Sequence, residues 1–257
     1  MRRDMRDRLD GKRIIVIGSA TGIGAATVRR LVNEGAHVCA ADINLDGATA
    51  CATTAGGNAF AVSLDIVDEA SVNRGVAEAI ERLGGLDGVH INAADLRVIF
   101  ADSNALEVDL AVFDRTLAVN LRGHLLCTRA ALPHLLANGG GAIVYTSSGS
   151  ADAGEPERPC YAMSKSGLHA LMRHVASRWG REAITANVVA PGFTMTAELE
   201  AGGQVPPALI ESFLAKGRSP RLGKSEDIAA MVAFLLSEDG RWVNGQAIHV
   251  NGGSLLH

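Results

Sequence analysis

Short apolar runs alternate with longer segments of helical periodicity along this chain, and that alternation restricts the fold more than any other feature. The runs are rich in β-branched residues and predict strands at residues 14–17, 37–41, 59–63, 88–92, 142–146, 185–190 and 247–250. Apolar residues three and four positions apart predict helices at residues 23–34, 71–83, 110–136, 161–179 and 224–236. Because the strands are apolar on both faces, we predict an α/β fold whose doubly wound, parallel, seven-stranded sheet has helices on both sides.

The length and composition suffice for a single domain. The 257 residues are 47% hydrophobic, which supplies one sizeable core. We therefore assign residues 1–257 to one domain. The segment 193–222 lacks a clear period and is interrupted by glycines and prolines. A loop of this length inside a compact domain is typical of a lid over a binding site.

The charge balance and the dispersed cysteines exclude several classes of function. Lys and Arg number 24 against 28 Asp and Glu, so no basic block predicts binding to nucleic acid or to an anionic membrane surface. The sequence contains neither a signal peptide nor a run of about 18 apolar residues, so we expect a cytoplasmic protein. The four cysteines and eight histidines are scattered, and we predict reduced thiols and no metal site.

A cluster of glycines follows the first predicted strand and leads directly into the first predicted helix. Its sequence is Gly18-Ser19-Ala20-Thr21-Gly22-Ile23-Gly24. Glycines let the backbone approach a pyrophosphate closely, and the unpaired N–H groups of a helix N-terminus favour its charge. The spacing differs from the plain GxGxxG pattern, and such glycines also occur in ordinary strand-to-helix turns. We interpret the cluster as a dinucleotide-binding turn.

An acidic residue, Asp42, ends the second predicted strand. It lies eighteen residues beyond Gly24, close to the separation of about 20 at which a carboxylate meets the adenosine ribose. A carboxylate accepts hydrogen bonds from the ribose hydroxyls and repels a 2′-phosphate, and neither Lys nor Arg follows within residues 43–46. The sequence therefore favours NAD over NADP. The alternative is that Asp42 serves only as a helix cap or turn residue.

Tyr161 and Lys165 stand four positions apart at the start of a predicted helix, on the same helix face. A tyrosine ionises near pH 10, and a neighbouring ammonium favours the phenolate, so the pair is suited to proton transfer. By itself, such a pair is more often a solvated helix face. Its position after the glycine cluster and Asp42 favours the catalytic interpretation.

The order of these motifs resembles the short-chain dehydrogenase/reductase family, of the YxxxK type, over essentially the whole chain. The resemblance implies a Rossmann fold, a nicotinamide cofactor and hydride transfer between a secondary alcohol and its ketone. Four residues match the catalytic positions of the family, namely Asn120, Ser148, Tyr161 and Lys165. The resemblance implies that Ser148 binds the substrate oxygen and that Tyr161 is the acid and base. It also implies that Asn120 organises a water-linked proton path to Lys165.

The same resemblance extends the cofactor site beyond the glycine cluster and Asp42. The matching positions are Ile43, Asp65, Ile66, Asn92, Ala93, Tyr161, Lys165, Pro191, Gly192, Thr194 and Thr196. Asp65 is implied beside the adenine, although it could equally cap the helix beginning near Asp68. The sequence reads Ile91-Asn92-Ala93-Ala94 where the family has NNAG, and this departure affects the expected cofactor affinity more than catalysis.

Two further interpretations compete with an alcohol dehydrogenase or carbonyl reductase. A catalytically silent NAD-binding sensor or scaffold would keep the fold, but it would not need Ser148, Tyr161, Lys165 and Asn120. An enoyl reductase of the same superfamily is disfavoured because those relatives space Tyr and Lys more widely.

The helices at residues 110–136 and 161–179 carry more apolar residues than one buried stripe needs, which predicts a second packing surface. Resemblance to the family makes a homotetramer the expected assembly.

Overall fold

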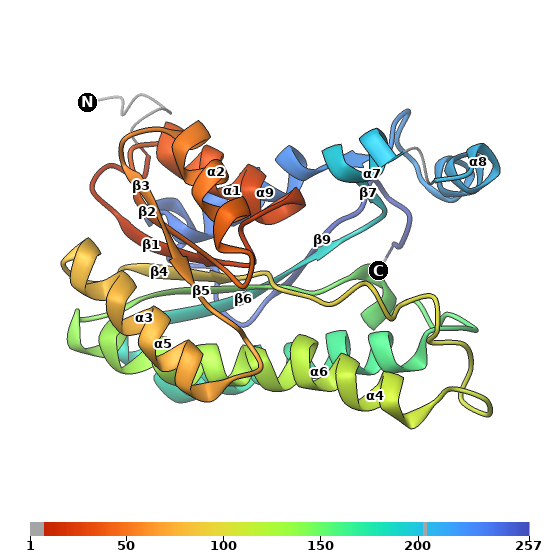
Figure 1. Cartoon of the computed structure of the whole chain (residues 1–257), viewed down its shortest axis with the longest axis horizontal. Coiled ribbons are helices and arrows are strands. Elements are labelled where there is room, and N and C mark those ends of the chain that lie inside the picture. The colour runs from red at the N-terminus through yellow and green to blue at the C-terminus, as the bar shows by residue number, and fades with distance from the viewer. Residues whose placement is uncertain (1–7, 203–204, 257) are drawn as a thin grey trace.

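The protein folds around a seven-stranded parallel sheet, shown in Figure 1. The computed structural model describes residues 8–202 and 205–256. The strands are β1 (Arg13–Ile17), β2 (His37–Asp42), β3 (Ala59–Ser63), β4 (Gly88–Ile91), β5 (Gly141–Thr146), β6 (Ile184–Pro191) and β9 (Ala247–Val250). They lie in the order β3-β2-β1-β4-β5-β6-β9. The predicted fold class is therefore confirmed, with every predicted strand present.

Helices cover both faces of the sheet (Figure 1). On one face lie α1 (Gly22–Asn33), α2 (Leu45–Ala55) and α9 (Ser225–Leu236), and on the other lie α3 (Glu69–Leu83), α5 (Gly123–Ala137) and α6 (Pro159–Trp179). Successive strand residues serve opposite layers, as the pleat requires. Ile14 and Val16 of β1 belong to the core under α1 and α9, whereas Ile15 and Ile17 belong to the core under α5 and α6.

Two helical regions differ from the sequence prediction. The helix α2 was not predicted, because its alanines and threonines give no strong apolar stripe. Asn44 starts it by accepting a hydrogen bond from the N–H of Gly47 at 3.0 Å. The predicted helix at residues 110–136 is α4 (Leu110–Leu117) followed by α5, with a π-helical turn at Ala118–Arg122 between them. Such turns often occur at functional sites, and this one contains Asn120.

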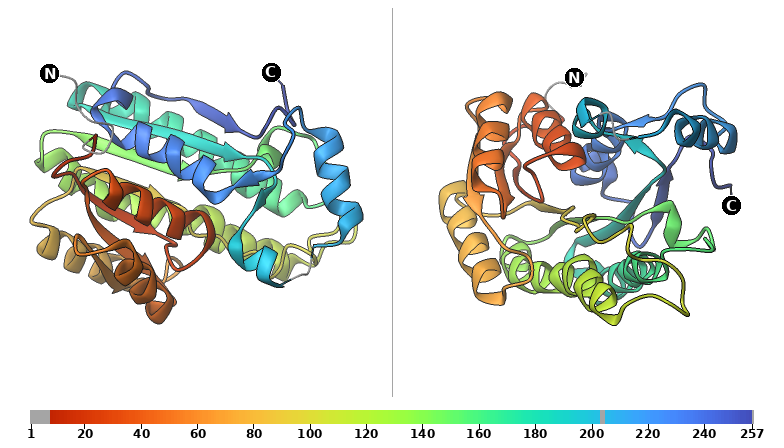
Figure 2. Two further views of the ribbon diagram at one scale, coloured as in Figure 1. Left: turned by 90° about the horizontal axis from the view of Figure 1, so that it is seen from above. Right: turned by 45° about the vertical axis from the view of Figure 1, so that its right-hand side comes forward.

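The segment 193–222 is not a continuous loop. It contains β7 (Thr194–Met195), α7 (Ala197–Gly202) and α8 (Pro207–Lys216), and β7 pairs with β8 (Gly223–Lys224). Residues 203 and 204 lie outside the described residues. Pro207 favours a helix start because its fixed φ and missing N–H suit the first helical position. In Figure 2 the segment, coloured cyan to blue, stands at the end of the sheet where β6 finishes.

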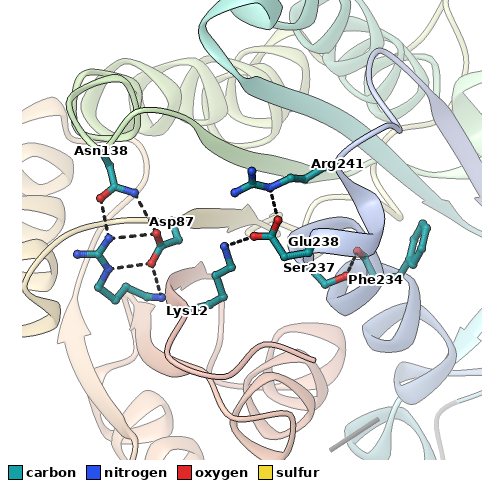
Figure 3. Close-up of polar contacts among 8 residues, drawn as sticks. Lys12, Asp87, Asn138, Phe234, Ser237, Glu238 and Arg241 are labelled. Carbon is teal, nitrogen blue, oxygen red and sulfur yellow. Dashed lines mark hydrogen bonds and ion pairs between the residues drawn. The ribbon is translucent and has the colours of Figure 1, made fainter. Parts of the chain in front are cut away.

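Ion pairs hold together the opposite edge of the sheet, where the strands begin. Figure 3 shows Lys12 and Arg241 reaching Glu238 from two sides, each at 2.6 Å. Nearby, the Arg13 guanidinium contacts Asp87 at 2.8 Å, and Asn138 donates to the same carboxylate at 2.9 Å. The starts of β1 and β4 are thereby joined to the ends of α5 and α9.

Among residues 8–202 and 205–256, the structure has no helix that combines the length and the apolar character needed to cross a membrane.

Candidate active site

The glycine-rich turn lies between β1 and α1, beside the end of β4. Gly18 has a φ of +85°, and a Cβ there would stand 2.6 Å from the backbone of Ala93. A Cβ on Gly24 would stand 1.9 Å from the Gly18 oxygen, so both positions require glycine. The Asn92 side chain donates to that same oxygen at 2.9 Å. The turn and the predicted Asn92-Ala93 pair therefore lie together where the strand order reverses, the usual place for a nucleotide in such sheets.

The N-terminus of α1 has no side-chain cap. Thr21 is its N-cap residue but makes no side-chain capping bond, and its first turn has no acidic residue. The Ser19 hydroxyl is buried and donates to the Ala41 oxygen at 3.1 Å, so this side chain supports the turn. A helix N-terminus without a side-chain cap suits an anion such as a cofactor diphosphate. One acceptor that the sequence did not predict, Glu198 of α7, meets the N–H of Gly22 at 3.2 Å.

Asp42 lies at the end of β2 with its carboxylate against the glycine-rich turn. Its Oδ2 accepts the N–H of Ala20 at 2.9 Å, and its Oδ1 accepts the N–H of Asn44 at 2.9 Å. Asp42 thus closes a turn, but Asn44 caps α2. A carboxylate has about four acceptor positions, so two such bonds leave capacity for ribose hydroxyls. Ile43 is 67% exposed beside it.

Asp65 and Ile66 follow β3. Asp65 accepts the N–H of Val67 at 3.0 Å, whereas Asp68 caps α3 through the N–H of Ala70 at 2.9 Å. In the structure the cap of α3 is therefore Asp68 and not Asp65. Ile66 is buried, and a Cβ on Gly123 would stand 2.6 Å from its side chain. Any cofactor contact of Ile66 would accordingly involve its main chain.

Tyr161 stands in the first turn of α6 with its side chain half-buried. Burial raises the pKa of Tyr161, while a hydrogen bond with Ser148 and the charge of Arg158 lower it. Lys165 is 1% exposed, and its Nζ lies 5.7 Å from the centre of the Tyr161 ring. The expected lowering of the phenol's pKa by Lys165 is not found, because the net direction is upward and Lys165 is not among its causes.

The structure distinguishes the two adjacent serines at the end of β5. Ser147 is buried, donates to the Lys165 main-chain oxygen at 3.1 Å and lies 2.9 Å from Nε2 of His169. Ser148 instead bonds the Tyr161 phenol and accepts the N–H of Ser150 at 3.2 Å. Of the two, only Ser148 is among the groups that act on the pKa of the Tyr161 phenol.

Asn120 is fully buried in the π-helical turn. Its Oδ1 accepts the N–H of Asp95 at 3.0 Å, and its Nδ2 lies 3.5 Å from Oγ of Ser164. Ser164 in turn donates to the Tyr161 main-chain oxygen at 2.7 Å. Asn120 therefore has the interior partners that a buried amide needs, and it links the segment after β4 to α6.

The residues predicted after β6 also gather at this end of the sheet. A Cβ on Gly192 would stand 2.9 Å from Asn251, which explains the glycine after the buried Pro191. The Thr194 hydroxyl donates to the Gly192 oxygen at 3.1 Å. Thr196 accepts the N–H of Leu199 at 3.3 Å, and its methyl group would lie 3.4 Å from a Cβ on Gly22. The segment after β6 thus reaches the N-terminus of α1.

Sequence reasoning missed three residues of this region: Glu198, Asp102 and Thr146. Asp102 accepts the N–H of Tyr161 at 2.8 Å, and the Thr146 main-chain oxygen accepts from Lys165 Nζ at 2.9 Å. Both act across long stretches of chain, and no local pattern in the sequence signals either contact.

Comparisons with known proteins agree with this geometry. Residues 18–254 match the family model described as enoyl-(acyl carrier protein) reductase. A probable short-chain type dehydrogenase/reductase of Bradyrhizobium diazoefficiens is 40% identical, with 97% of this chain and 89% of that protein covered. The 7alpha-hydroxysteroid dehydrogenase of Bacteroides fragilis is 32% identical, with 98% and 97% covered.

A solved structure extends the likeness to the fold. The 3-ketoacyl-(acyl-carrier-protein) reductase of Brucella melitensis, complexed with NADH, superposes with a TM-score of 0.88 at 28% identity, covering 96% of this chain and 100% of that one. The fold, the motifs and these relatives identify the chain as an oxidoreductase built to use a nicotinamide cofactor. It belongs to the short-chain dehydrogenase/reductase family.

Proposed function

We propose that the protein is an NAD-dependent dehydrogenase or reductase that interconverts secondary alcohols and ketones, with Tyr161 as the acid and base. The observation that carries the proposal is the grouping around the Tyr161 phenol, where Ser148 is hydrogen-bonded and Lys165 Nζ lies 5.7 Å from the ring centre. A silent scaffold would not need this arrangement of proton-exchanging groups.

Each side chain has a distinct task in the proposed reaction. Ser148 donates a hydrogen bond to the substrate oxygen and holds it beside the phenol. In alcohol oxidation, Tyr161 as phenolate accepts the hydroxyl proton, and in ketone reduction it returns a proton to the oxygen. Lys165 holds a buried positive charge 5.7 Å from the ring centre, and Asn120 joins the segment after β4 to α6 through Asp95 and Ser164. A bound nicotinamide ring supplies or takes up the hydride.

The residues around the glycine-rich turn support NAD as the cofactor. The close approach at Gly18 and Gly24 and the donors of the α1 N-terminus suit a diphosphate. Asp42 presents a negative charge where the ribose would bind, and no Lys or Arg is found at residues 43–46 to hold a 2′-phosphate. The Lys165 ammonium would also contact the nicotinamide ribose.

The segment 193–222 bears on the substrate class through its apolar side chains. Phe193 and Phe213 stack with their ring centres 4.1 Å apart, so part of the apolar material of this segment packs on itself. Leu199 and Leu209 remain exposed on α7 and α8 and could cover an apolar alcohol.

The test is NADH formation across a panel of secondary alcohols, with Tyr161→Phe as the control protein. Turnover of at least one alcohol by the native protein and not by the variant is expected. An enoyl thioester belongs in the panel with NADH, because the matching family model is described as an enoyl reductase. NADH binding without turnover of any compound would favour the scaffold. Consumption of the enoyl thioester alone would favour the enoyl reductase.

A further inference from the structure

The link between β4 and α4 contains a buried carboxylate, Asp102, that contacts the start of α6. Asp102 is 2% exposed. Its Oδ2 accepts the N–H of Tyr161 at 2.8 Å, and its Oδ1 accepts the N–H of Cys160 at 3.2 Å. Its main-chain oxygen accepts the N–H of Arg158 at 3.1 Å. One residue of a distant segment therefore binds three consecutive donors around the first turn of α6.

The start of α6 needs this contact because it lacks a cap of its own. The N-cap residue, Arg158, has φ 65° and ψ 48°, in the left-handed region, and makes no side-chain capping bond. Pro159 comes next and has no N–H, so the first donors of the helix are those of Cys160 and Tyr161. Asp102 satisfies both and places a negative charge at the positive end of the helix.

The same contact fixes the backbone that carries the proposed acid and base. Tyr161 donates to Asp102 through its N–H, and its carbonyl oxygen accepts from Ser164 at 2.7 Å. Its phenol meets Ser148, which belongs to a different segment, after β5. The meeting of phenol and serine therefore depends on where α6 begins.

We propose that Asp102 is a positioning residue that sets the start of α6 so that the Tyr161 phenol meets Ser148. The inference rests on the proposed role of Tyr161. Asp102 would act without touching the substrate. It acts through the two hydrogen bonds to the backbone of Cys160 and Tyr161.

The groups around Tyr161 predict how its pKa would change if the phenol were displaced. Burial raises the pKa of Tyr161, the bond with Ser148 and the charge of Arg158 lower it, and Glu155 raises it. Lys165 faces the ring at 5.7 Å, and Asp102 faces the backbone. If Asp102 acts through position, its replacement breaks the bond with Ser148 and raises the pKa of Tyr161 further. If its charge acted directly, removing that charge would lower the pKa.

Tyrosine titration in the cofactor-free protein separates these outcomes without any turnover. The chain has two tyrosines, and burial raises the pKa of the other, Tyr145, well beyond the ordinary value. Protein labelled with carbon-13 at the tyrosine Cζ gives two NMR signals, and Tyr161→Phe assigns them. Asp102→Asn is expected to move the Tyr161 titration to higher pH by about half a unit or more. An unchanged midpoint, or a shift to lower pH, would overturn the proposal.

Kinetics supply the second readout. Asp102→Asn is expected to lower the plateau of kcat by about ten- to a hundredfold, the loss typical of a misplaced catalytic group, with the Kd of NADH within about twofold. Asp102→Glu keeps the charge but is too long to keep both bonds, so it should behave like Asp102→Asn. The matched control is Asp109→Asn, which removes the charge of the α4 cap residue on the same segment, where Asp109 accepts the N–H of Ala111 at 2.8 Å. That variant should keep both kcat and the Tyr161 titration.

Several results would count against a positioning role. Native kcat in either folded Asp102 variant would overturn it, and so would an equal loss of NADH affinity and turnover. Failure of both variants to fold would show that Asp102 supports the whole domain and would also overturn a specific role toward Tyr161. The native protein could turn over no compound while Asp102→Asn still moves the Tyr161 titration to higher pH. That result would contradict the proposed function and still support this inference.

Discussion

Lys165 donates a hydrogen bond from Nζ to the main-chain oxygen of Thr146, 2.9 Å away, and so joins α6 to the carboxyl end of β5. Thr146 is held from its other side, because its Oγ1 lies 2.8 Å from Nε2 of His90. The ammonium is 1% exposed, and burial lowers the pKa of Lys165 to about 8. The protein therefore maintains a cation at a position where burial opposes its charge.

This burial predicts a pH-dependent stability difference between the native protein and Lys165→Met. The pKa of Lys165 rises from about 8 when folded to 10.5 when unfolded, so the unfolded chain binds more protons between those values. The native protein should therefore gain stability relative to the variant as pH rises from 8 to 10.5, by up to roughly 3 kcal/mol. Urea unfolding of both cofactor-free proteins at pH 7, 9 and 10 measures the difference. Parallel pH profiles would contradict a buried, destabilised ammonium.

Tyr161→Phe should separate binding from turnover. The substitution removes the hydroxyl that exchanges the proton and leaves the ring and the bond from the backbone N–H to Asp102 in place. We expect kcat to fall by at least about a hundredfold while the Kd of NADH changes less than about twofold. Fluorescence titration with NADH and steady-state rates give the two values. Activity close to native would remove Tyr161 from its role.

Cofactor preference should move when the charge at the end of β2 is reversed. Asp42→Ala removes the repulsion of a 2′-phosphate, and Ile43→Arg, at a position 67% exposed, adds a guanidinium that can bind that phosphate with two hydrogen bonds. The ratio of kcat/KM for NAD to that for NADP should fall in the double variant, with one alcohol held fixed. Native preference for NADP, or an unmoved ratio, would show that Asp42 does not meet the ribose.

The position of Glu198 predicts that removing its charge increases the affinity for the cofactor. Its carboxylate accepts the N–H of Gly22 at 3.2 Å, at the helix terminus proposed for the diphosphate. Burial alone would raise the pKa of Glu198, but hydrogen bonds from backbone N–H groups and Thr196 hold it below the ordinary value, so the group is an anion. Glu198→Gln should therefore tighten NADH binding by about two- to fivefold, the range of a helix-terminus charge effect. Glu200→Gln, exposed on the same helix, is the control, and equal affinities in all three proteins would refute the idea.

An apolar groove on the outer surface predicts self-association. Its lining includes Leu117, Leu121 and Leu125 from the α4 to α5 region and Leu171 from α6. Leu132, Leu168 and Val175, which lie in the same two predicted helices, are instead buried in the core. We expect a homotetramer that Leu125→Glu splits into smaller species, as measured by light scattering. Leu45→Glu, which alters a residue of matched exposure on α2 (43% against 44%), should leave the assembly intact. A native monomer would refute the prediction.

The strands were predictable because each is a continuous apolar run in a sheet covered on both faces, and no observed bound differs from the predicted one by more than one residue. The glycine-rich turn and the Tyr161–Lys165 spacing are equally local, so sequence located them. The contact of Asp102 with Tyr161 joins segments far apart in the chain, and its carboxylate has no neighbouring motif. The π-helical turn at Asn120 was missed because its residues continue an ordinary apolar helix pattern.

The two ends of the parallel strands have different roles, because ion pairs lie where the strands begin and the proposed site lies where they finish. Lys12, Arg13, Asp87 and Glu238 clamp the edge where the strands begin, and none of the residues proposed for chemistry belongs to that clamp. Directed evolution of substrate range can therefore vary α8 (Pro207–Lys216), which lies away from this clamp and from the proposed cofactor residues Thr194 and Thr196. Libraries that vary the link between β4 and α4 should keep Asp102, because its loss would remove both hydrogen bonds to the start of α6.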